Sequence, residues 1–521
     1  MLKIMADIKG KRNKIYTALA SALNLVKNKR RSLNQRMEQH YSPTHLALMA
    51  AAACMLIMVV MLFVPSYLGV ANDSVANHKM KGFGLDYLDR ESSRDEEFQP
   101  NEYFTRVYEN IYADEQEFTV HTLFVKLAKA VDYFFTKDHL FDIRFLGMLY
   151  GLLWLPGIFL LMKTALERVK YFSEGVVLAV AGVIIFADVS YLTYFNSLYA
   201  DALLYICLVY IAGAALALHK KSRWSACYIL VLTIFGTVFC FISKRCFIAG
   251  VLFAFFCILQ IRVLEEYRLK RMLVLAAAVL LTGSIVSFFQ CAEEFDETGK
   301  YHAMTRGVLL QSQNPVETLD DFGIDPSYAV LADTSLYDYF PVSELENPLL
   351  HEDFMDEYNT GEVALYYIKH PGAMISMWDI GIKSAFNLRR SYCGNYESSV
   401  GMPAMAKSIF WSAWSIFKER SAPKTIGYLV LLVILFSVMS GRKVFNKRVV
   451  DRWDYVYFTG MVIFLLTGMA DLTYVILKSG DAQLVQFNMV IGVVMDILFY
   501  YVLAEILHKL NILEAKNAEK G

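Results

Sequence analysis

The chain has 521 residues, of which 56% are hydrophobic and 19% charged, and its formal net charge is −1. Soluble domains are roughly 45–50% apolar and about 25% charged. The composition therefore excludes a disordered chain, a collagen, a coiled coil and a small disulfide scaffold. The balanced charge gives no reason to expect a nucleic-acid partner. A polytopic membrane protein is the class to test against the apolar runs.

Residues 1–45 form a basic segment in front of the first long apolar run. That run is too long for a signal-peptide core, it lies too far from the N-terminus, and no small-residue cleavage site follows it. We therefore expect the run to stay in the chain as a span. The basic segment predicts a cytoplasmic orientation signal that includes an amphipathic helix lying on anionic lipid.

Ten apolar runs of about 20 residues recur along the chain, each bounded by charges. A helix of this length crosses about 30 Å of hydrocarbon. The predicted spans are Leu46–Ser66, Leu146–Lys163, Gly175–Leu192, Asp201–Leu218, Trp224–Ile242, Phe247–Leu264, Met272–Phe289, Ile426–Ser440, Tyr455–Leu477 and Val485–Leu507. We expect an all-α polytopic membrane protein, with seven spans in an N-terminal module, residues 46–289, and three in a C-terminal module, residues 425–521.

Lysine and arginine gather in alternate loops. One set contains the basic tail and the loops ERVKYF, HKKSR, EEYRLKR and GRKVFNKRVVDR, and the other set contains the long acidic segments. Because basic loops stay on the cytoplasmic side, ten spans place both termini inside the cell. Two long segments, residues 67–144 and 290–424, then face outward.

The two outward segments have different patterns. In the first, HTLFVKLAKAVDYFF repeats apolar residues at helical spacing, which predicts a helix on the membrane surface. In the second, NPVE, IDPS, ENPL and KHPG are proline-centred helix stops or starts, which predicts a helical extracellular domain. That domain also holds Cys291 and Cys393, which either form a disulfide or stay as thiols.

Acidic residues cluster at the outer ends of the predicted spans. Asp73 follows the first span, Asp188 lies near the outer end of the third, and Asp201 begins the fourth. Secondary transporters usually carry internal repeats and ionisable groups at the bilayer midplane, and we find no convincing repeat in this sequence. Acids at the membrane surface below an outer domain suit a reaction on a lipid-linked substrate.

The chain contains, in order, the stretches ANDSVANHKMKGFGL, NEYFTRVYENI, FDIRFLGMLYGLLW, YFNSLYADALL, YHAMTRGVLLQSQNPVETLDDFGIDPSYAVLADTSLY, YYIKHPG and RRSYCGNYESS. They resemble stretches of GT-C-type integral-membrane glycosyltransferases, and more narrowly of the hexose transferases that modify surface and wall glycans of Gram-positive bacteria. The resemblance implies a GT-C-like bundle, a polyprenyl-phosphate sugar donor, and transfer on the extracellular face of the plasma membrane. It also implies an acidic base in the first outer loop, at the position of Asp73. Between the last two spans, similar proteins carry an acidic stretch with Lys and His, whereas this chain has KSGDAQLVQFN.

Inverting sugar transfer needs a base, groups that stabilise the leaving phosphate, and a groove for the lipid. Asp73 is the candidate base, and helix capping is the simpler role for it. Asp201 is a candidate for binding the acceptor or a divalent cation, Mg²⁺ or Mn²⁺, and equally a candidate N-cap. Asp188 is a weaker candidate for the same role.

Four basic residues are candidates for binding the donor phosphate. Lys244 and Arg245 form a dibasic outer turn against the general charge asymmetry, so they need an anionic partner. A donor phosphate, a lipid headgroup or an acidic protein segment would each serve. Arg306 and His302 follow the seventh span, and the guanidinium group matches phosphate oxygens well. Packing within a loop is the commoner outcome for both.

Three further residues have a structural explanation. Asp496 lies well inside the last span, where a carboxylate must be paired or protonated, and we interpret it as a hydrogen-bond centre between helices. Arg389 and Arg390 precede SYCGNYE, and solvation at the surface explains them most simply.

The sequence predicts an inverting membrane hexosyltransferase whose partners are a polyprenyl-phosphate donor, a glycan or wall-polymer acceptor, and the bilayer. One alternative is a flippase or exporter of lipid-linked glycan, in which Asp471 and Asp496 would line a central cavity. A second is a polysaccharide polymerase or ligase. A third is a non-catalytic assembly partner, whose outer acids would not share a cavity.

Overall fold

The structure is a computed structural model, and it is predominantly helical. It describes residues 42–519 except 89–98, 113–118, 337–349, 442–443 and 446–450, together with residues 21 and 29. The amphipathic helix expected in the basic N-terminal segment lies outside the described residues.

Five helices among the described residues are long and apolar enough to cross a membrane. They are α2 (Pro43–Phe63), α5 (Arg144–Leu166), α11 (Tyr267–Gln290), α21 (Arg452–Ser479) and α22 (Met489–Glu519). A sixth crossing results if α6 (Phe172–Phe186) and the turns Val189–Asn196 are taken as one span bent by 41°. Shorter apolar helices complete the bundle, namely α8 (Asp201–Ala217), α9 (Ser225–Cys240), α10 (Phe247–Gln260) and α19 (Ile426–Phe436).

The expected all-α polytopic membrane fold is confirmed, and each of the ten apolar runs overlaps one of these helices. Individual boundaries differ from the predicted ones. The first helix, for example, begins at Pro43, with Ser42 as its cap, rather than at Leu46. The third run is broken at Asp188, which caps the short helix α7 (Val189–Leu192). Since α10 has 14 residues, it is about 21 Å long, shorter than the hydrocarbon core. Among the described residues, five to six crossings satisfy the length requirement, so the count of ten stays a prediction.

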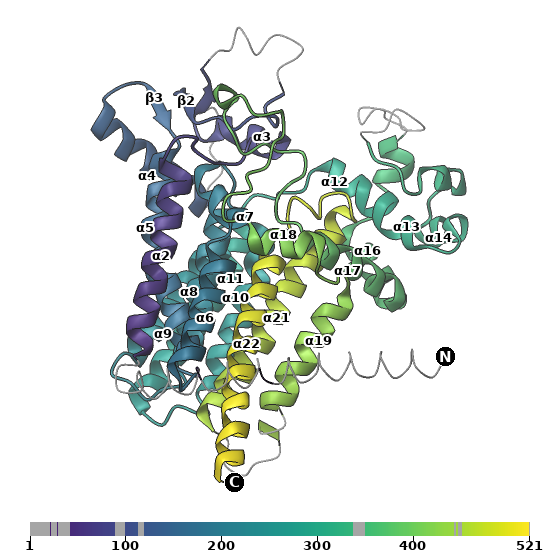
Figure 1. The fold of residues 1–521 in the computed structure, drawn as a ribbon. Helices are drawn as coiled ribbons and strands as arrows, with labels where there is room; N and C mark the ends of the chain where they lie inside the picture. The colour runs from purple at the N-terminus through teal and green to yellow at the C-terminus, as the bar shows by residue number, and fades with distance from the viewer. Residues whose placement is uncertain are drawn as a thin grey trace, which may run out of the picture.

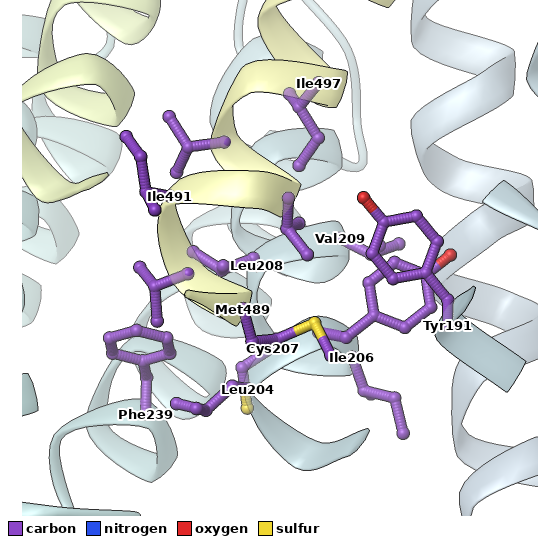
Figure 2. Close-up of a cluster of buried hydrophobic side chains, with 14 of the residues drawn as sticks. Tyr191, Leu204, Ile206, Cys207, Leu208, Val209, Phe239, Met489, Ile491 and Ile497 are labelled. Carbon is purple, nitrogen blue, oxygen red and sulfur yellow. The ribbon is translucent and has the colours of Figure 1, made fainter. Parts of the chain in front are cut away.

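Helix α8 lies inside the bundle, and all 17 of its residues are buried. Figure 2 shows Leu204 of α8 near Phe239 of α9 and Met489 of α22. A helix that is apolar all round is surrounded by other helices, so α8 has no stripe left for lipid. Its first residue, Asp201, is therefore held in place by packing on every side of the helix.

Both long non-spanning segments lie at one end of the bundle, which we call the loop end (Figure 1). The first segment contains α3 (Ser74–Gly82), α4 (Val120–Thr136) and the strands β1 (Leu85–Tyr87), β2 (Val107–Asn110) and β3 (Leu140–Asp142). The strands form an antiparallel sheet in the order β1-β2-β3, with Leu85 opposite Asn110 and Val107 opposite Asp142. Strands of three or four residues are too short to show a period-two pattern, so the sequence analysis missed this sheet.

The second segment forms a helical lobe beside the loop end (Figure 1). Its helices are α12 (Glu297–His302), α13 (Leu309–Gln311), α14 (Pro315–Phe322), α16 (Thr360–Lys369), α17 (Pro371–Ala385) and α18 (Ala413–Arg420). Shorter helical turns of this segment lie at Ala303–Val308, Pro326–Leu331, His351–Met355 and Ser398–Val400. Two more lie outside it, at Lys244–Cys246 between α9 and α10 and at Ser437–Gly441 after α19. Pro315, Pro326 and Pro371 each begin a helix or helical turn, as predicted. The fourth predicted stretch, ENPL, lies outside the described residues.

Helix α4 has the amphipathic character that its sequence predicts. Leu123, Leu127 and Phe134 are 58%, 49% and 73% exposed, whereas Val125 and Ala128 on the other face are buried against the protein. A row of exposed apolar side chains on a helix beside a membrane bundle is the arrangement of an interfacial helix. We therefore expect α4 to lie at the membrane surface.

Candidate active site at the loop end

Asp73 lies where the chain turns from α2 into α3. Its Oδ1 accepts a hydrogen bond from the backbone N–H of Ala76 at 3.1 Å, so it caps α3. The backbone N–H of Asp73 donates to the hydroxyl of Tyr199 at 2.7 Å. The residue is 5% exposed. The capping role uses Oδ1 and leaves Oδ2 for a second partner.

Arg390 is that second partner. Its Nη1 donates to Asp73 Oδ2 at 2.7 Å, and its Nη2 donates to Asp201 Oδ2 at 3.3 Å. The guanidinium carbon lies 3.9 Å from the centre of the Tyr199 ring. Burial alone would lower the pKa of Arg390, but the surrounding tyrosines and carboxylates raise it well above its usual value. We call Asp73, Arg390 and Asp201 the acid–arginine centre.

A segment that we call the strap, residues 386–412, carries Arg390 into the centre. At Gly394 a Cβ atom would lie 2.0 Å from the carbonyl oxygen of Glu102, so only glycine permits this close approach. The ammonium group of Lys407 donates to the backbone carbonyl of Arg390. Burial lowers the pKa of Lys407 to about 8. The strap is thus held against Glu102 at Gly394, and Lys407 fixes the backbone of Arg390 within it.

The connection between α21 and α22 closes the centre from another side. The carbonyl oxygen of Gln486 accepts from Nη2 of Arg390 at 2.8 Å. Asp481 accepts from Nε of Arg306 at 2.6 Å. Gly480 has φ +55°, and a Cβ there would lie 2.7 Å from the backbone of Arg306. This connection is the stretch KSGDAQLVQFN, where the sequence differs from the glycosyltransferases that it otherwise resembles.

A second ionic cluster lies beside the acid–arginine centre. Nη1 of Arg245 donates to both carboxylate oxygens of Asp471, at 2.9 and 2.8 Å, and its Nε donates to Glu294 at 3.1 Å. Glu294 also accepts from Lys79 of α3 at 3.2 Å. Burial alone would raise the pKa of Glu294, but Lys79 and Arg245 hold it below its usual value. Asp73 and Lys79 are at the cap and in the last turn of α3, so this helix joins the two clusters.

A cavity of about 500 Å³ lies between α3, the start of α4 and Ser243. Two groups that line the cavity lack an ionic or hydrogen-bonding partner among the described residues. Lys81 forms no ion pair there, and Nε2 of buried His121 has no hydrogen-bond partner. Burial, followed by the nearby charge of Lys79, lowers the pKa of His121 to about 3, so its ring is neutral. We call this the α3–α4 cavity.

The four basic residues predicted to meet a phosphate already have protein partners. Arg245 and Arg306 bind the carboxylates described above, and Nζ of Lys244 lies 3.5 Å from Glu293. His302 is fully buried, and its Nε2 lies 3.2 Å from the hydroxyl of Ser335. Lys244 and Arg245 adjoin the α3–α4 cavity, whereas His302 and Arg306 lie in and just after α12. Their roles toward a phosphate stay predictions.

Asp188 and Asp496 serve the packing of the bundle. Asp188 accepts from three backbone N–H groups, those of Ser190, Trp414 and Ser415, so it joins the broken third span to the start of α18. Asp496 accepts from Nζ of Lys418 at 2.9 Å and from the indole N–H of Trp414 at 2.7 Å. Any role of Asp188 toward an acceptor or a metal stays a prediction.

The divalent cation suggested by the sequence does not fit the residues in place. Among the described residues, no three His, Cys, Asp or Glu side chains gather as they would around a metal ion. Asp73 and Asp201 are both bound by Arg390, whose charge lies where a bridging cation would sit. We derive no step through a metal.

Sequence reasoning missed several members of the site. Arg390 looked like a solvated surface residue, and neither Glu294 nor His121 was singled out. The dibasic turn at Lys244 and Arg245 signalled an anionic partner, and the acidic run CAEEFDE was the nearby place to seek it. No periodic pattern linked Arg390 to Asp73, because 317 residues separate them. The question about Cys291 and Cys393 is answered, since both thiols are free.

Comparison with known proteins identifies a family. The family model for the YfdI N-terminal transmembrane domain matches residues 27–521. No curated protein and no solved structure matches the chain.

Proposed function

The chain belongs to the family of the YfdI N-terminal transmembrane domain, and on that premise we propose that it is a membrane glycosyltransferase. We propose further that it moves a hexose from a polyprenyl-phosphate donor to a surface glycan or wall polymer, with inversion. One observation carries this proposal: two carboxylates share a buried arginine at the end of the bundle, beside a cavity at the base of an interfacial helix. With α4 at the membrane surface, this site would lie at the depth where a lipid-linked phosphate leaves the hydrocarbon.

The α3–α4 cavity suits the phosphate and sugar of such a donor. Lys81 supplies an unmatched positive charge, and neutral His121 supplies a hydrogen-bonding nitrogen. Lys244 and Arg245 lie at its edge, where Glu293 and Glu294 balance them until an anion competes. Lys79 follows Asp73, the cap of α3, by six residues, which is about 9 Å of helix. A donor bound in this cavity would therefore have its sugar near Asp73.

In the proposed reaction, a hydroxyl oxygen of the acceptor attacks the anomeric carbon of the hexose. The bond from that carbon to the phosphate oxygen breaks, and the polyprenyl phosphate leaves with the electron pair. Asp73 accepts the hydroxyl proton, a contribution of about 10²–10⁴ in rate. Arg390 positions Asp73, and Asp201 holds Arg390 from the other side. Arg390 also has an unpartnered Nε–H among the described residues.

The loop end would face outward in the plasma membrane of a bacterium. The basic loops of the sequence lie between the other ends of the helices, and basic loops remain in the cytoplasm. A cytoplasmic position for both termini follows from the same rule. An outward loop end also presents the helical lobe to glycans outside the cell.

The contacts of Asp471 and Asp496 weigh against the flippase or exporter. That alternative needs both acids in one polar passage, but Asp471 is paired with Arg245 and Asp496 with Lys418. The non-catalytic partner stays an alternative, because Asp73 and Asp201 meet at one arginine but neither acid lines the α3–α4 cavity.

The test is sugar transfer by the purified chain in lipid nanodiscs, with a radiolabelled polyprenyl-phosphate hexose and surface glycan from cells that lack the gene. Asp73→Asn keeps the cap of α3 and an acceptor for Arg390, but it removes the base. We expect transfer to fall at least about 100-fold. The thermal unfolding temperature should stay close to that of the wild type, because Asp201 still pairs with the charge of Arg390. Asp325→Asn is the matched control, because Asp325 caps a helical turn elsewhere in the lobe.

Full transfer by Asp73→Asn would remove the base assignment. Movement of the labelled lipid across vesicles without sugar transfer would contradict the whole proposal, and transfer of an intact oligosaccharide would identify a ligase.

A further inference from the structure

The helical lobe carries a polar groove of about 710 Å³, within the size range of ligand sites. One wall comes from the end of α13 and from α14, and the other from the junction of α16 and α17. We call it the lobe groove. It is separate from the α3–α4 cavity, with which it shares no lining residue.

The walls of the lobe groove have free hydrogen-bonding groups. The side-chain amides of Gln311 and Gln313 bond no other side chain or backbone group within the described part of the chain, and they line the groove. Asp321 and Lys369 also line it without forming ion pairs among the described residues. Amides both donate and accept hydrogen bonds and carboxylates accept them, and the hydroxyl groups of a sugar can pair with each. The two acids and one lysine of the walls, Glu317, Asp321 and Lys369, do not favour an anionic ligand.

An aromatic pair lies at the junction of α16 and α17. The rings of Tyr366 and His370 are tilted by 34°, with their centres 4.4 Å apart. Nδ1 of His370 lies 3.0 Å from the carbonyl oxygen of Tyr366, to which it donates a hydrogen bond. Ring faces beside hydrogen-bonding groups are the combination that receives the C–H face and the hydroxyl groups of a sugar together.

Helix α17 separates the lobe groove from the acid–arginine centre. It begins at Pro371 in the groove and ends at Ala385, next to the strap that carries Arg390. Its 15 residues span about 22 Å. The lobe is anchored to the bundle through this helix, because Trp378 donates to Thr473 at 3.0 Å and Asn488 donates to the carbonyl of Ser384 at 2.9 Å. A single hexose cannot reach from one site to the other, whereas an oligosaccharide chain can.

We infer that the lobe groove binds a neutral oligosaccharide stretch of the acceptor, at a distance from the sugar that receives the hexose. This rests on the proposed function for its choice of acceptor. The groove would retain a long acceptor between transfers and give long chains an advantage over short ones.

The experiment measures binding of surface polysaccharide, prepared from cells that lack the gene and separated into long chains and fragments of one or two sugars. The full chain in nanodiscs is compared with the variant Gln311→Ala/Gln313→Ala/Asp321→Ala. We expect the Kd for long chains to rise at least tenfold in the variant, with little change for short fragments. Asp320→Ala is the matched control, since Asp320 neighbours Asp321 on α14 but does not line the groove.

Wild-type affinity in the triple variant would overturn the inference, as would equal affinity of the wild type for long chains and short fragments. Binding is read without turnover, so Asp73→Asn should bind long chains as the wild type does. The triple variant should still transfer hexose to a short fragment. Absence of transfer by the wild type would therefore count against the proposed function. Transfer by the wild type without a preference for binding long chains would count against the groove alone.

Discussion

At the scale of single residues, Arg390 is the group on which the site depends. It is 4% exposed and holds two carboxylates that are themselves buried, Asp73 and Asp201. Removing one partner of a buried ion pair leaves an uncompensated charge, which costs about 3–5 kcal/mol. The stability of the loop end should therefore depend on the balance of charge there more than on any one hydrogen bond.

We expect Arg390→Met to lower the free energy of unfolding by about 3–5 kcal/mol, measured by denaturant unfolding in detergent. Adding Asp73→Asn and Asp201→Asn to the same chain should restore most of that loss, because no buried charge remains unpaired. Arg389→Met is the control, since its partner Glu419 is 41% exposed and exposed pairs contribute about 1 kcal/mol or less. Equal losses from Arg389→Met and Arg390→Met would contradict this account.

Lys407 gives the strap a pH dependence with a defined sign. Burial lowers its pKa in the folded chain to about 8, from 10.5. Between these values the unfolded chain binds more protons than the folded chain, so stability rises with pH across that window. The difference in unfolding temperature between the wild type and Lys407→Met should shift in favour of the wild type from pH 8 to pH 10. A shift in the opposite direction would show that Lys407 is not buried as described.

At the scale of elements, α4 sets the depth of the site in the membrane. Its exposed apolar face includes Phe134 and Phe135, and its first turn supplies His121 and Thr122 to the α3–α4 cavity. An interfacial helix buries such a face about 5–10 Å into the headgroup boundary. The cavity is therefore expected at the membrane surface.

A fluorophore on Phe134→Cys should be quenched by nitroxide-labelled lipid, because this position is 73% exposed on the apolar face of α4. The variant is made with Cys227→Ser, since Cys227 is the exposed cysteine among the described residues. A fluorophore on Asp320→Cys in the lobe serves as control and should be quenched little. Equal quenching at the two positions would place α4 away from the lipid.

The elements differ in how well the sequence predicts them. Apolar runs and proline starts were recognised because both signals are local, as at Pro371 and along the first span. The sheet was missed because its strands are too short for a pattern. The bend at Asp188 also escaped prediction. There Asp188 accepts from the backbone N–H of Trp414, which is distant in the sequence, so no local pattern marks the position.

At the scale of the whole molecule, the site is an assembly of segments that the sequence could not bring together. Asp73 follows the first span, Asp201 begins the fourth, and Arg390 comes from the strap. The two acids were identified because each adjoins an apolar run. The arginine was not, because its partners are fixed only by the packing of the bundle. The pairing of charges at the loop end is thus determined by the folded packing and not by a local sequence pattern.

The most direct measurement is a structure of the chain in lipid with a non-hydrolysable polyprenyl phosphonate sugar. The phosphonate should lie in the α3–α4 cavity within hydrogen-bond distance of Lys81, with the anomeric carbon toward Asp73. An apolar groove of about 580 Å³ between α2 and α6 is the contrasting location. A headgroup bound there, or at the end of the bundle opposite the loop end, would contradict the proposed reaction centre.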